Sequence, residues 1–274
     1  MKKILFGLTL FSGLAFADPI EQYDLFLPAQ QNNHMEFFAG AGVMIYPAYF
    51  DDDGNWKSLD DASVLSYYTY ATSPFGLSFS MFSSLELSFR WALQELYVAY
   101  SDDDYDDVDT SGFDQPILGL KYGIQDLGLA FSIQLYLPFG SKIFVGDDPT
   151  LNTDFALIAN EMWGHFHLRG AMDYLWIPEN KNNIDYGNEF TFDIRPGVAL
   201  GRSKTVTLEL AYLFHVKNVT AYEGEDYSGT SSWAALVAPG ILIQRNDFLK
   251  IEAMIPVSVD GDEGTAAGVG FVAQ

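Results

Sequence analysis

Apolar and polar side chains alternate over long stretches of this chain. Residues 205–218 show the pattern most fully, with an apolar parity of Val206, Leu208, Leu210, Tyr212, Phe214 and Val216. The other parity carries polar side chains, among them Thr207, Glu209 and Lys217. Successive residues of a β-strand point to opposite faces of its sheet. The alternation therefore predicts a strand with one apolar face and one polar face.

The same alternation recurs elsewhere, which indicates a sheet built from many such strands. It is clear in 129–139, 166–177, 189–200 and 248–259, and less clean in 63–82, 154–163 and 232–244. Strands of soluble proteins usually run to about five or six residues, whereas a strand that crosses a bilayer needs about nine to eleven. The length of the segments therefore favours strands with lipid on one face and water on the other.

Strand and turn patterns together predict an all-β fold, a transmembrane up-and-down antiparallel β-barrel of about twelve strands. The predicted strands are 34–47, 63–82, 85–100, 114–125, 129–139, 154–163, 166–177, 188–201, 205–218, 232–244, 248–259 and 265–274. Short turns at 83–84, 126–128, 164–165, 202–204 and 245–247 alternate with longer connections at 48–62, 101–113, 140–153, 178–187, 219–231 and 260–264. This rhythm is typical of short periplasmic turns and longer outer loops.

A soluble β-sandwich is the alternative fold for such strands. The two folds place the apolar parity differently, outward against lipid in a barrel and inward between two sheets in a sandwich. Tyrosines and tryptophans gather near the predicted strand ends, as in the interfacial girdles of membrane barrels; they include Tyr46, Tyr49, Tyr67, Tyr97, Tyr100, Trp163, Trp176 and Trp233.

The amino terminus predicts export. Lys2 and Lys3 precede the apolar run 4–16, and Ala15-Phe16-Ala17 has the small-x-small form of a cleavage site. We therefore expect residues 1–17 to be a signal peptide. Residues 18–33 would form either a plug in the lumen or a periplasmic tail, and residues 34–274 would form the barrel.

Charge and composition narrow the class of partners. The chain has 14 Lys and Arg against 37 Asp and Glu, a formal net charge of −23, which argues against binding nucleic acid. It has no cysteine, so disulfides, thiol chemistry and a lipoprotein anchor are excluded. Many acids fall in the long connections, where they would solvate the outer rim or bind divalent cations that bridge to lipopolysaccharide phosphates.

A search for catalytic or metal-binding patterns gives little. His165, His167, Arg169 and Asp173 could bring a base near a charged pair, but a hydrogen-bond network in the lumen explains them equally simply. No Gly-x-Ser-x-Gly motif and no phosphate-binding loop occurs. The segment 51–62 has the odd acidic spacing of a calcium loop but ends in Ala62 instead of glutamate. We therefore expect no enzyme activity, no cofactor and no metal site.

The polar parity of the strands predicts the lining of the lumen. Both signs of charge occur on neighbouring strands, so cross-strand pairing is expected. The predicted lining residues are Glu36, Glu86, Arg90, Lys121, Gln134, His167, Arg169, Asp173, Asp193, Arg195, Glu209, Lys217, Lys250 and Glu252. We expect the six cations to face the carboxylates across the lumen, in a field that orients polar solutes.

Short motifs resemble the outer-membrane transporter family known as "meta-pathway of phenol degradation" proteins, over about residues 35–274. They are 112-GFDQPILGLKYGIQ-125, 129-LAFSIQLYLPFGSK-142 and 74-PFGLSFSMFSSLELSFRWAL-93, together with Pro196-Gly197 and Pro239-Gly240. Phe75 stands where the family usually has Tyr. Outer-membrane barrels usually end on an aromatic residue that the assembly machinery recognises, whereas Phe271 lies three residues before the last residue here.

The resemblance implies a porin or channel proposed to pass small hydrophobic or aromatic compounds. We therefore expect an outer-membrane channel for passive passage of small solutes. Its partners would be membrane lipid, lipopolysaccharide, the barrel-assembly machinery and the solute. The alternative is a barrel with a closed lumen, which would serve as a structural or surface-binding protein through its acidic loops.

Overall fold

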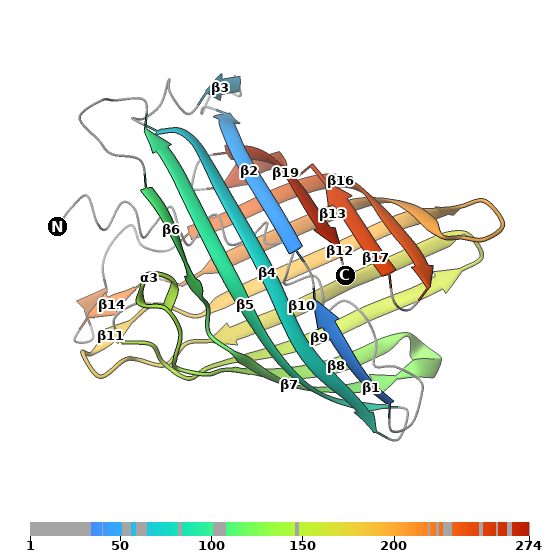
Figure 1. Ribbon diagram of the computed structural model, residues 1–274, viewed down its shortest axis with the longest axis horizontal. Helices are drawn as coiled ribbons and strands as arrows, with labels where there is room; N and C mark the ends of the chain where they lie inside the picture. The colour runs from blue at the N-terminus through green and yellow to red at the C-terminus, as the bar shows by residue number, and fades with distance from the viewer. Residues whose placement is uncertain are drawn as a thin grey trace.

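The structure is a computed structural model of the chain (Figure 1). It describes residues 34–39, 41–50, 56–58, 65–81, 84–100, 108–145, 148–218, 220–222, 225–226, 232–246, 249–255, 257–261 and 265–273. The predicted signal peptide and the segment 18–33 lie outside these residues, as does most of the candidate calcium loop at 51–62. No helix in the described part of the chain is long and apolar enough to cross a bilayer.

Antiparallel strands make up almost all of the described chain. The first half contains β1 (His34–Ala39), β2 (Ala41–Phe50), β3 (Trp56–Ser58), β4 (Leu65–Met81), β5 (Leu85–Tyr100), β6 (Val108–Phe113), β7 (Ile117–Ile124) and β8 (Leu129–Tyr136). The second half contains β9 (Asn152–Trp163), β10 (Phe166–Trp176), β11 (Ile184–Asp185), β12 (Glu189–Leu200), β13 (Val206–Lys217), β14 (Ala221–Tyr222), β15 (Glu225–Asp226), β16 (Ser232–Asn246), β17 (Leu249–Met254), β18 (Val257–Gly261) and β19 (Thr265–Ala273). Short helices occur at Gln125–Leu127 (η3) and Lys142–Val145 (α3).

Each long strand pairs with the next long strand along the chain, as an up-and-down barrel requires. Pairing runs from β4 through β5, β7, β8, β9, β10, β12, β13, β16 and β17 to β19. The last strand, β19, pairs with β2, which pairs with β4, so these pairings lead back to their starting strand. Figure 1 shows β2, β4 and β5 crossing in front of β9, β10, β12 and β13.

All twelve predicted strands occur in the described part of the chain, counting collinear pieces together. β1 with β2 form the first, and β17 with β18 form the eleventh. One prediction was wrong in detail, because the long connection 101–113 contains β6, which extends the wall by pairing with β5. β11, β14 and β15 form a small separate sheet from the long connections 178–187 and 219–231. Each of these strands has two residues, too few to show an alternating pattern in the sequence.

The apolar parity of the long strands faces outward. On β8, Phe131 and Ile133 are 53% and 43% exposed. The alternate residues Ser132 and Gln134 are 4% exposed each. On β13, Leu208 is 46% exposed and Glu209 is 8% exposed. Soluble monomers rarely leave apolar patches larger than a few hundred Å² open to water. The β-sandwich alternative is therefore wrong, because it requires the apolar parity to be buried.

Aromatic side chains mark the two borders of this apolar band. Trp163 stacks on Phe166 beside the short turn at 164–165, with ring centroids 5.9 Å apart. Trp176 lies at the other end of β10 and is 47% exposed. A span of ten residues at roughly 3.3 Å per residue, tilted by about 40°, covers roughly 25 Å of bilayer thickness. The band between the aromatic rows therefore fits the hydrocarbon layer.

Candidate functional site

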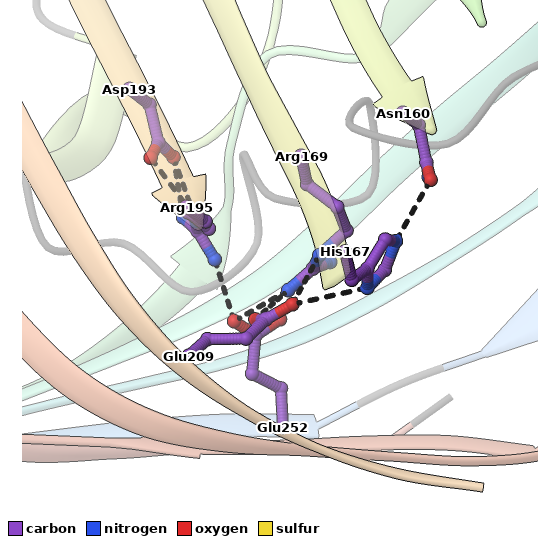
Figure 2. A network of polar contacts seen from close by, with 7 residues as sticks. All are labelled: Asn160, His167, Arg169, Asp193, Arg195, Glu209 and Glu252. Carbon is purple, nitrogen blue, oxygen red and sulfur yellow. Dashed lines mark hydrogen bonds and ion pairs between the residues drawn. The ribbon is translucent and has the colours of Figure 1, made fainter. Parts of the chain in front are cut away.

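Seven polar side chains gather on the inward face of five strands, and Figure 2 shows their contacts. We call this group the polar belt; it consists of Asn160, His167, Arg169, Asp193, Arg195, Glu209 and Glu252. The residues come from β9, β10, β12, β13 and β17, which lie along one side of the wall. The belt lies nearer the short turns than the long connections, because Arg169, Glu209 and Glu252 each follow a short turn closely in sequence.

Arg169 joins three strands. Its Nε donates to Glu209 Oε1 at 3.0 Å, and its NH2 group donates to Glu209 Oε2 at 2.5 Å. The same NH2 group donates to Glu252 Oε1 at 3.1 Å. Two parallel hydrogen bonds from a planar guanidinium to one carboxylate form the strongest common type of ion pair. Arg169 is 0% exposed, so this pair is held away from water.

Arg195 makes a second, adjoining pair. Its Nε and NH2 groups donate to the carboxylate of Asp193, two residues earlier on β12, at 2.5 to 2.9 Å. Its NH1 group donates to Glu252 Oε1 at 2.6 Å. Glu252 therefore accepts from both arginines, and it links two ion pairs that would otherwise be separate. Arg195 is also 0% exposed, and Glu252 is 9% exposed.

His167 closes the belt toward β9. Its Nε2 lies 3.0 Å from the amide oxygen of Asn160, and its Nδ1 lies 3.6 Å from Glu209 Oε1. An amide oxygen can only accept, so Nε2 carries a hydrogen in this arrangement. Neighbouring strands bring these groups together, since His167 is in register with Met162 on β9 and with Gly197 on β12.

Gly197 makes room for the belt. A Cβ atom at this position would lie 2.9 Å from Glu209 Cγ, 2.8 Å from Thr207 Cγ2 and 2.9 Å from the Leu208 carbonyl oxygen. Any larger residue would push the Glu209 side chain away from Arg169. The Pro196-Gly197 motif therefore has a structural reason, because its glycine lets the side chain of the next strand lie across β12.

Other predicted lining residues also pair on the inward face. Glu86 and Lys121 are in register on β5 and β7, with 4.0 Å between Glu86 Oε1 and Lys121 Nζ. Arg90 donates to Gln134 Oε1 at 2.6 Å, and both side chains are buried. These two contacts join β5, β7 and β8, strands that contribute no residue to the polar belt.

Four predicted positions remain, two on the inward parity and two whose side chains are outside the described part of the structure. Lys217 Nζ lies 3.6 Å from Glu189 Oε1, on the neighbouring strand. Asp173 is half-buried on β10, in register with Thr191. Glu36 and Lys250 lie in β1 and β17, but their side chains are outside the described part of the structure.

The expected arrangement of charges across the lumen needs correction. The ion pairs that the structure describes join neighbouring positions of the wall, and in the belt the cations and carboxylates alternate: Asp193, Arg195, Glu252, Arg169, Glu209. Charges that are adjacent on a wall satisfy each other at contact distance, whereas charges on opposite walls would remain separated and poorly paired.

Sequence reasoning missed several inward polar residues. Asn160 and Asp154 lie on β9, whose alternation is less clean because the apolar Ala156 and Ile158 share the inward parity with them and Glu161 lies on the outward parity. Glu189 and His215 lie on the inward parity of β12 and β13, and this position was the one sequence signal that could have identified them. His215 is 2% exposed, and its Nδ1 lies 3.2 Å from Thr191 Oγ1.

The histidine pair at 165 and 167 does not form a shared site. His165 lies in the turn before β10, and its Nδ1 is 2.8 Å from the carbonyl oxygen of Ala199. His167 points into the belt instead. The described part of the chain contains no group of three or more His, Asp or Glu residues placed to hold a metal ion.

Burying so many charges has a physical consequence. Moving an ion out of water costs several kcal/mol even after relaxation, and close pairing offsets that cost only when the geometry is good. With His167 neutral, the belt contains two cations and three carboxylates, one formal negative charge in excess. Such a group keeps the strands in one register and gives the interior at this level a polar, negatively biased surface.

An outward apolar band, an inward face of paired charges and an up-and-down order of strands define an outer-membrane β-barrel. The chain belongs to the family described as "Putative MetA-pathway of phenol degradation", whose sequence profile matches residues 39–272. No curated protein sequence matches the chain.

A solved outer membrane channel has a similar fold. The chain is similar to an outer membrane channel from Pseudomonas putida F1, at 14% sequence identity and a TM-score of 0.60, over 90% of this chain and 96% of that one. The β-domain of the Bordetella autotransporter BrkA gives 9% identity and a TM-score of 0.48, over 86% and 97%. The translocator domain of the autotransporter NalP from Neisseria meningitidis gives 10% identity and a TM-score of 0.45, over 89% and 90%.

Proposed function

We propose that this protein is an outer-membrane channel through which small solutes pass passively. The observation that carries the proposal is that the inward face holds paired ionisable side chains in two separate groups of strands, β5 with β7 and β10 to β17. A barrel that served only as an anchor would need no interior charge, because replacing buried ion pairs by apolar residues is often neutral or stabilising. Retained interior charge therefore supports contact with water and polar solutes.

The finer proposal concerns the class of solute. The family description refers to phenol degradation, and the similar structure is called an outer membrane channel. A small aromatic compound with one polar group suits a lumen in which Ala130, Ala156 and Ile158 adjoin Ser132 and Gln134. We propose small neutral aromatic compounds such as phenols, together with other solutes of similar size, as the permeants.

One observation favours a second candidate, a barrel with a closed lumen. Arg169 and Arg195 are both 0% exposed, so water has no access to the centre of the belt in this state of the protein. A closed barrel would act as a structural protein or as a binding surface through its acidic connections. The two candidates differ in one measurable property, the passage of ions and solutes.

Reconstitution into planar bilayers and liposomes tests the proposal. We expect discrete conductance steps, and liposome swelling that falls steeply as the solute becomes larger. Ser132→Trp places a large side chain on the inward face of β8 and should reduce both signals severalfold. Ile133→Trp, one residue further on the outward face, is the matched control and should leave both unchanged.

Inserted, folded protein that gives neither conductance nor swelling would refute the channel and favour the closed barrel. Equal loss of signal in Ser132→Trp and Ile133→Trp would show that the inward face of β8 does not line the path. Migration of unheated samples on gels shows that each variant is folded, because folded barrels of this class resist the detergent until they are heated.

A further inference from the structure

We propose that the lumen selects for cations over anions, so that the permeants are neutral solutes and small cations, whereas aromatic carboxylates and other anions are disfavoured. The inference rests on the proposed channel function and adds its selectivity. It comes from the formal charges of the inward-facing side chains and from the charges of the connections at the outer rim.

The inward face of the described strands carries more carboxylates than cations. Seven carboxylates share the inward parity, namely Glu86, Asp154, Asp173, Glu189, Asp193, Glu209 and Glu252. Five cations share it, namely Arg90, Lys121, Arg169, Arg195 and Lys217. The excess is two formal negative charges. Glu36 and Lys250, the predicted lining residues whose side chains are not described, carry opposite charges and leave the difference unchanged.

This excess does not depend on which groups are hydrogen-bonded. An ion pair contributes no net charge to the interior, so pairing alters the local field but not the formal sum. The structure adds that these charged groups are buried. Asp154 is 6% exposed, and Asp193, Glu209 and Glu252 are 8% to 9% exposed, so bulk salt screens them weakly.

The belt concentrates part of the excess at one level of the barrel. Glu252 accepts from both Arg169 and Arg195, Glu209 also accepts from Arg169, and Asp193 also accepts from Arg195. The third carboxylate therefore has no third cation within the belt, and His167 is held by an amide oxygen on one side and faces Glu209 on the other. A permeating cation passing this level would meet a negative potential, and an anion would meet a barrier.

The long connections carry the same sign. The described parts carry seven acids against three lysines, namely Asp109, Asp148, Glu179, Asp185, Glu225, Asp226 and Asp260 against Lys57, Lys142 and Lys181. Lys181 pairs with Asp148 and is the one lysine in 178–187. The short turns at the opposite end carry three cations and two acids, namely Arg202, Lys204 and Arg245 against Asp126 and Asp247. An acidic rim raises the concentration of cations at that mouth before they reach the interior.

The size of the effect follows from Coulomb's law. One excess charge about 8 Å from a permeating ion, at an effective dielectric constant of about 40, changes the occupancy of a cation and of an anion by about fivefold each in opposite directions, and so changes their ratio by roughly thirtyfold before mobile salt screens the charge. We therefore expect K⁺ to permeate several times more readily than Cl⁻ through the wild-type channel.

The test is the reversal potential of the reconstituted full chain in a KCl gradient, with KCl alone as the probe. K⁺ selectivity should appear in the wild type. Asp154→Asn should lower the permeability ratio of K⁺ to Cl⁻ severalfold, and Lys121→Gln should raise it by a similar factor, since each changes the interior by one charge. Glu95→Gln removes a carboxylate from the exposed outward face of β5 and is the control.

The outcomes separate this inference from the proposed function. Conductance with no preference, or with a preference for Cl⁻, would overturn the selectivity and leave the channel standing. An absence of conductance in every variant would overturn the channel and the selectivity with it. A shift in Glu95→Gln as large as that in Asp154→Asn would overturn the assignment of selectivity to the interior. Opposite shifts in Asp154→Asn and Lys121→Gln, with none in Glu95→Gln, would support it.

Discussion

Replacing Glu252 with glutamine should lower the free energy of unfolding by about 3 kcal/mol, because removing one partner of a buried ion pair leaves charge uncompensated. Glu252 accepts hydrogen bonds from Arg169 at 3.1 Å and from Arg195 at 2.6 Å. Both arginines are 0% exposed, so neither can recover the lost interaction with water. Glutamine keeps the size of the side chain, which confines the change to charge. Unfolding by urea in lipid vesicles, followed by tryptophan fluorescence, measures it.

Glu86→Gln is the matched control for this substitution. Glu86 is also an inward carboxylate that faces a cation, but its oxygen lies 4.0 Å from Lys121 Nζ and its side chain is 15% exposed. A loose, partly hydrated pair of this kind contributes about 1 kcal/mol or less. Equal destabilisation by the two substitutions would show that the belt has no special weight in holding the strands together.

Ile133→Arg should destabilise the barrel in lipid by about 2 to 4 kcal/mol, the usual cost of an arginine on the lipid face near the bilayer centre. Ile133 lies midway along β8 on the outward parity and is 43% exposed. In a soluble protein an exposed isoleucine tolerates arginine with little change. The same urea titration in vesicles therefore distinguishes a wall that meets hydrocarbon from one that meets water.

Ser111→Arg provides the comparison outside the apolar band. Ser111 is exposed on β6, beyond Phe113, and its outward neighbour on β5 is Glu95. Arginine at this position should change the free energy of unfolding by less than about 0.5 kcal/mol. A large loss of stability at Ser111, or none at Ile133, would contradict the position we give to the membrane.

The strands were predictable because each of them carries its own signal. Alternation along 129–139 and 205–218 fixes which residues share a face, and the structure places Phe131, Ile133 and Leu208 outward as the barrel requires. Short turns such as 126–128 were predictable as well, since Gly128 adopts a positive φ of 60° that other residues rarely adopt. These features depend only on residues close together in sequence.

The belt was predictable as a set of residues but not as a set of contacts. Arg169 and Glu252 are 83 residues apart, and the distance between them depends on the register of four successive strand pairings. A shift of one residue in any pairing would turn a strand over and separate the charges. Parity alone also cannot say that Arg195 pairs with Asp193 on its own strand. Asn160 was missed because the alternation along β9 is less clean.

The central claim is that the apolar parity of the wall faces hydrocarbon and the polar parity faces the interior, and a scan of single nitroxide labels along 129–136 tests it most directly. The chain has no cysteine, so each labelled position needs only one substitution. In liposomes, collision with oxygen, which concentrates in lipid, should be high at residues 129, 131, 133 and 135. It should be low at residues 130, 132, 134 and 136. Uniform values along β8, or high values at the even positions, would contradict the account.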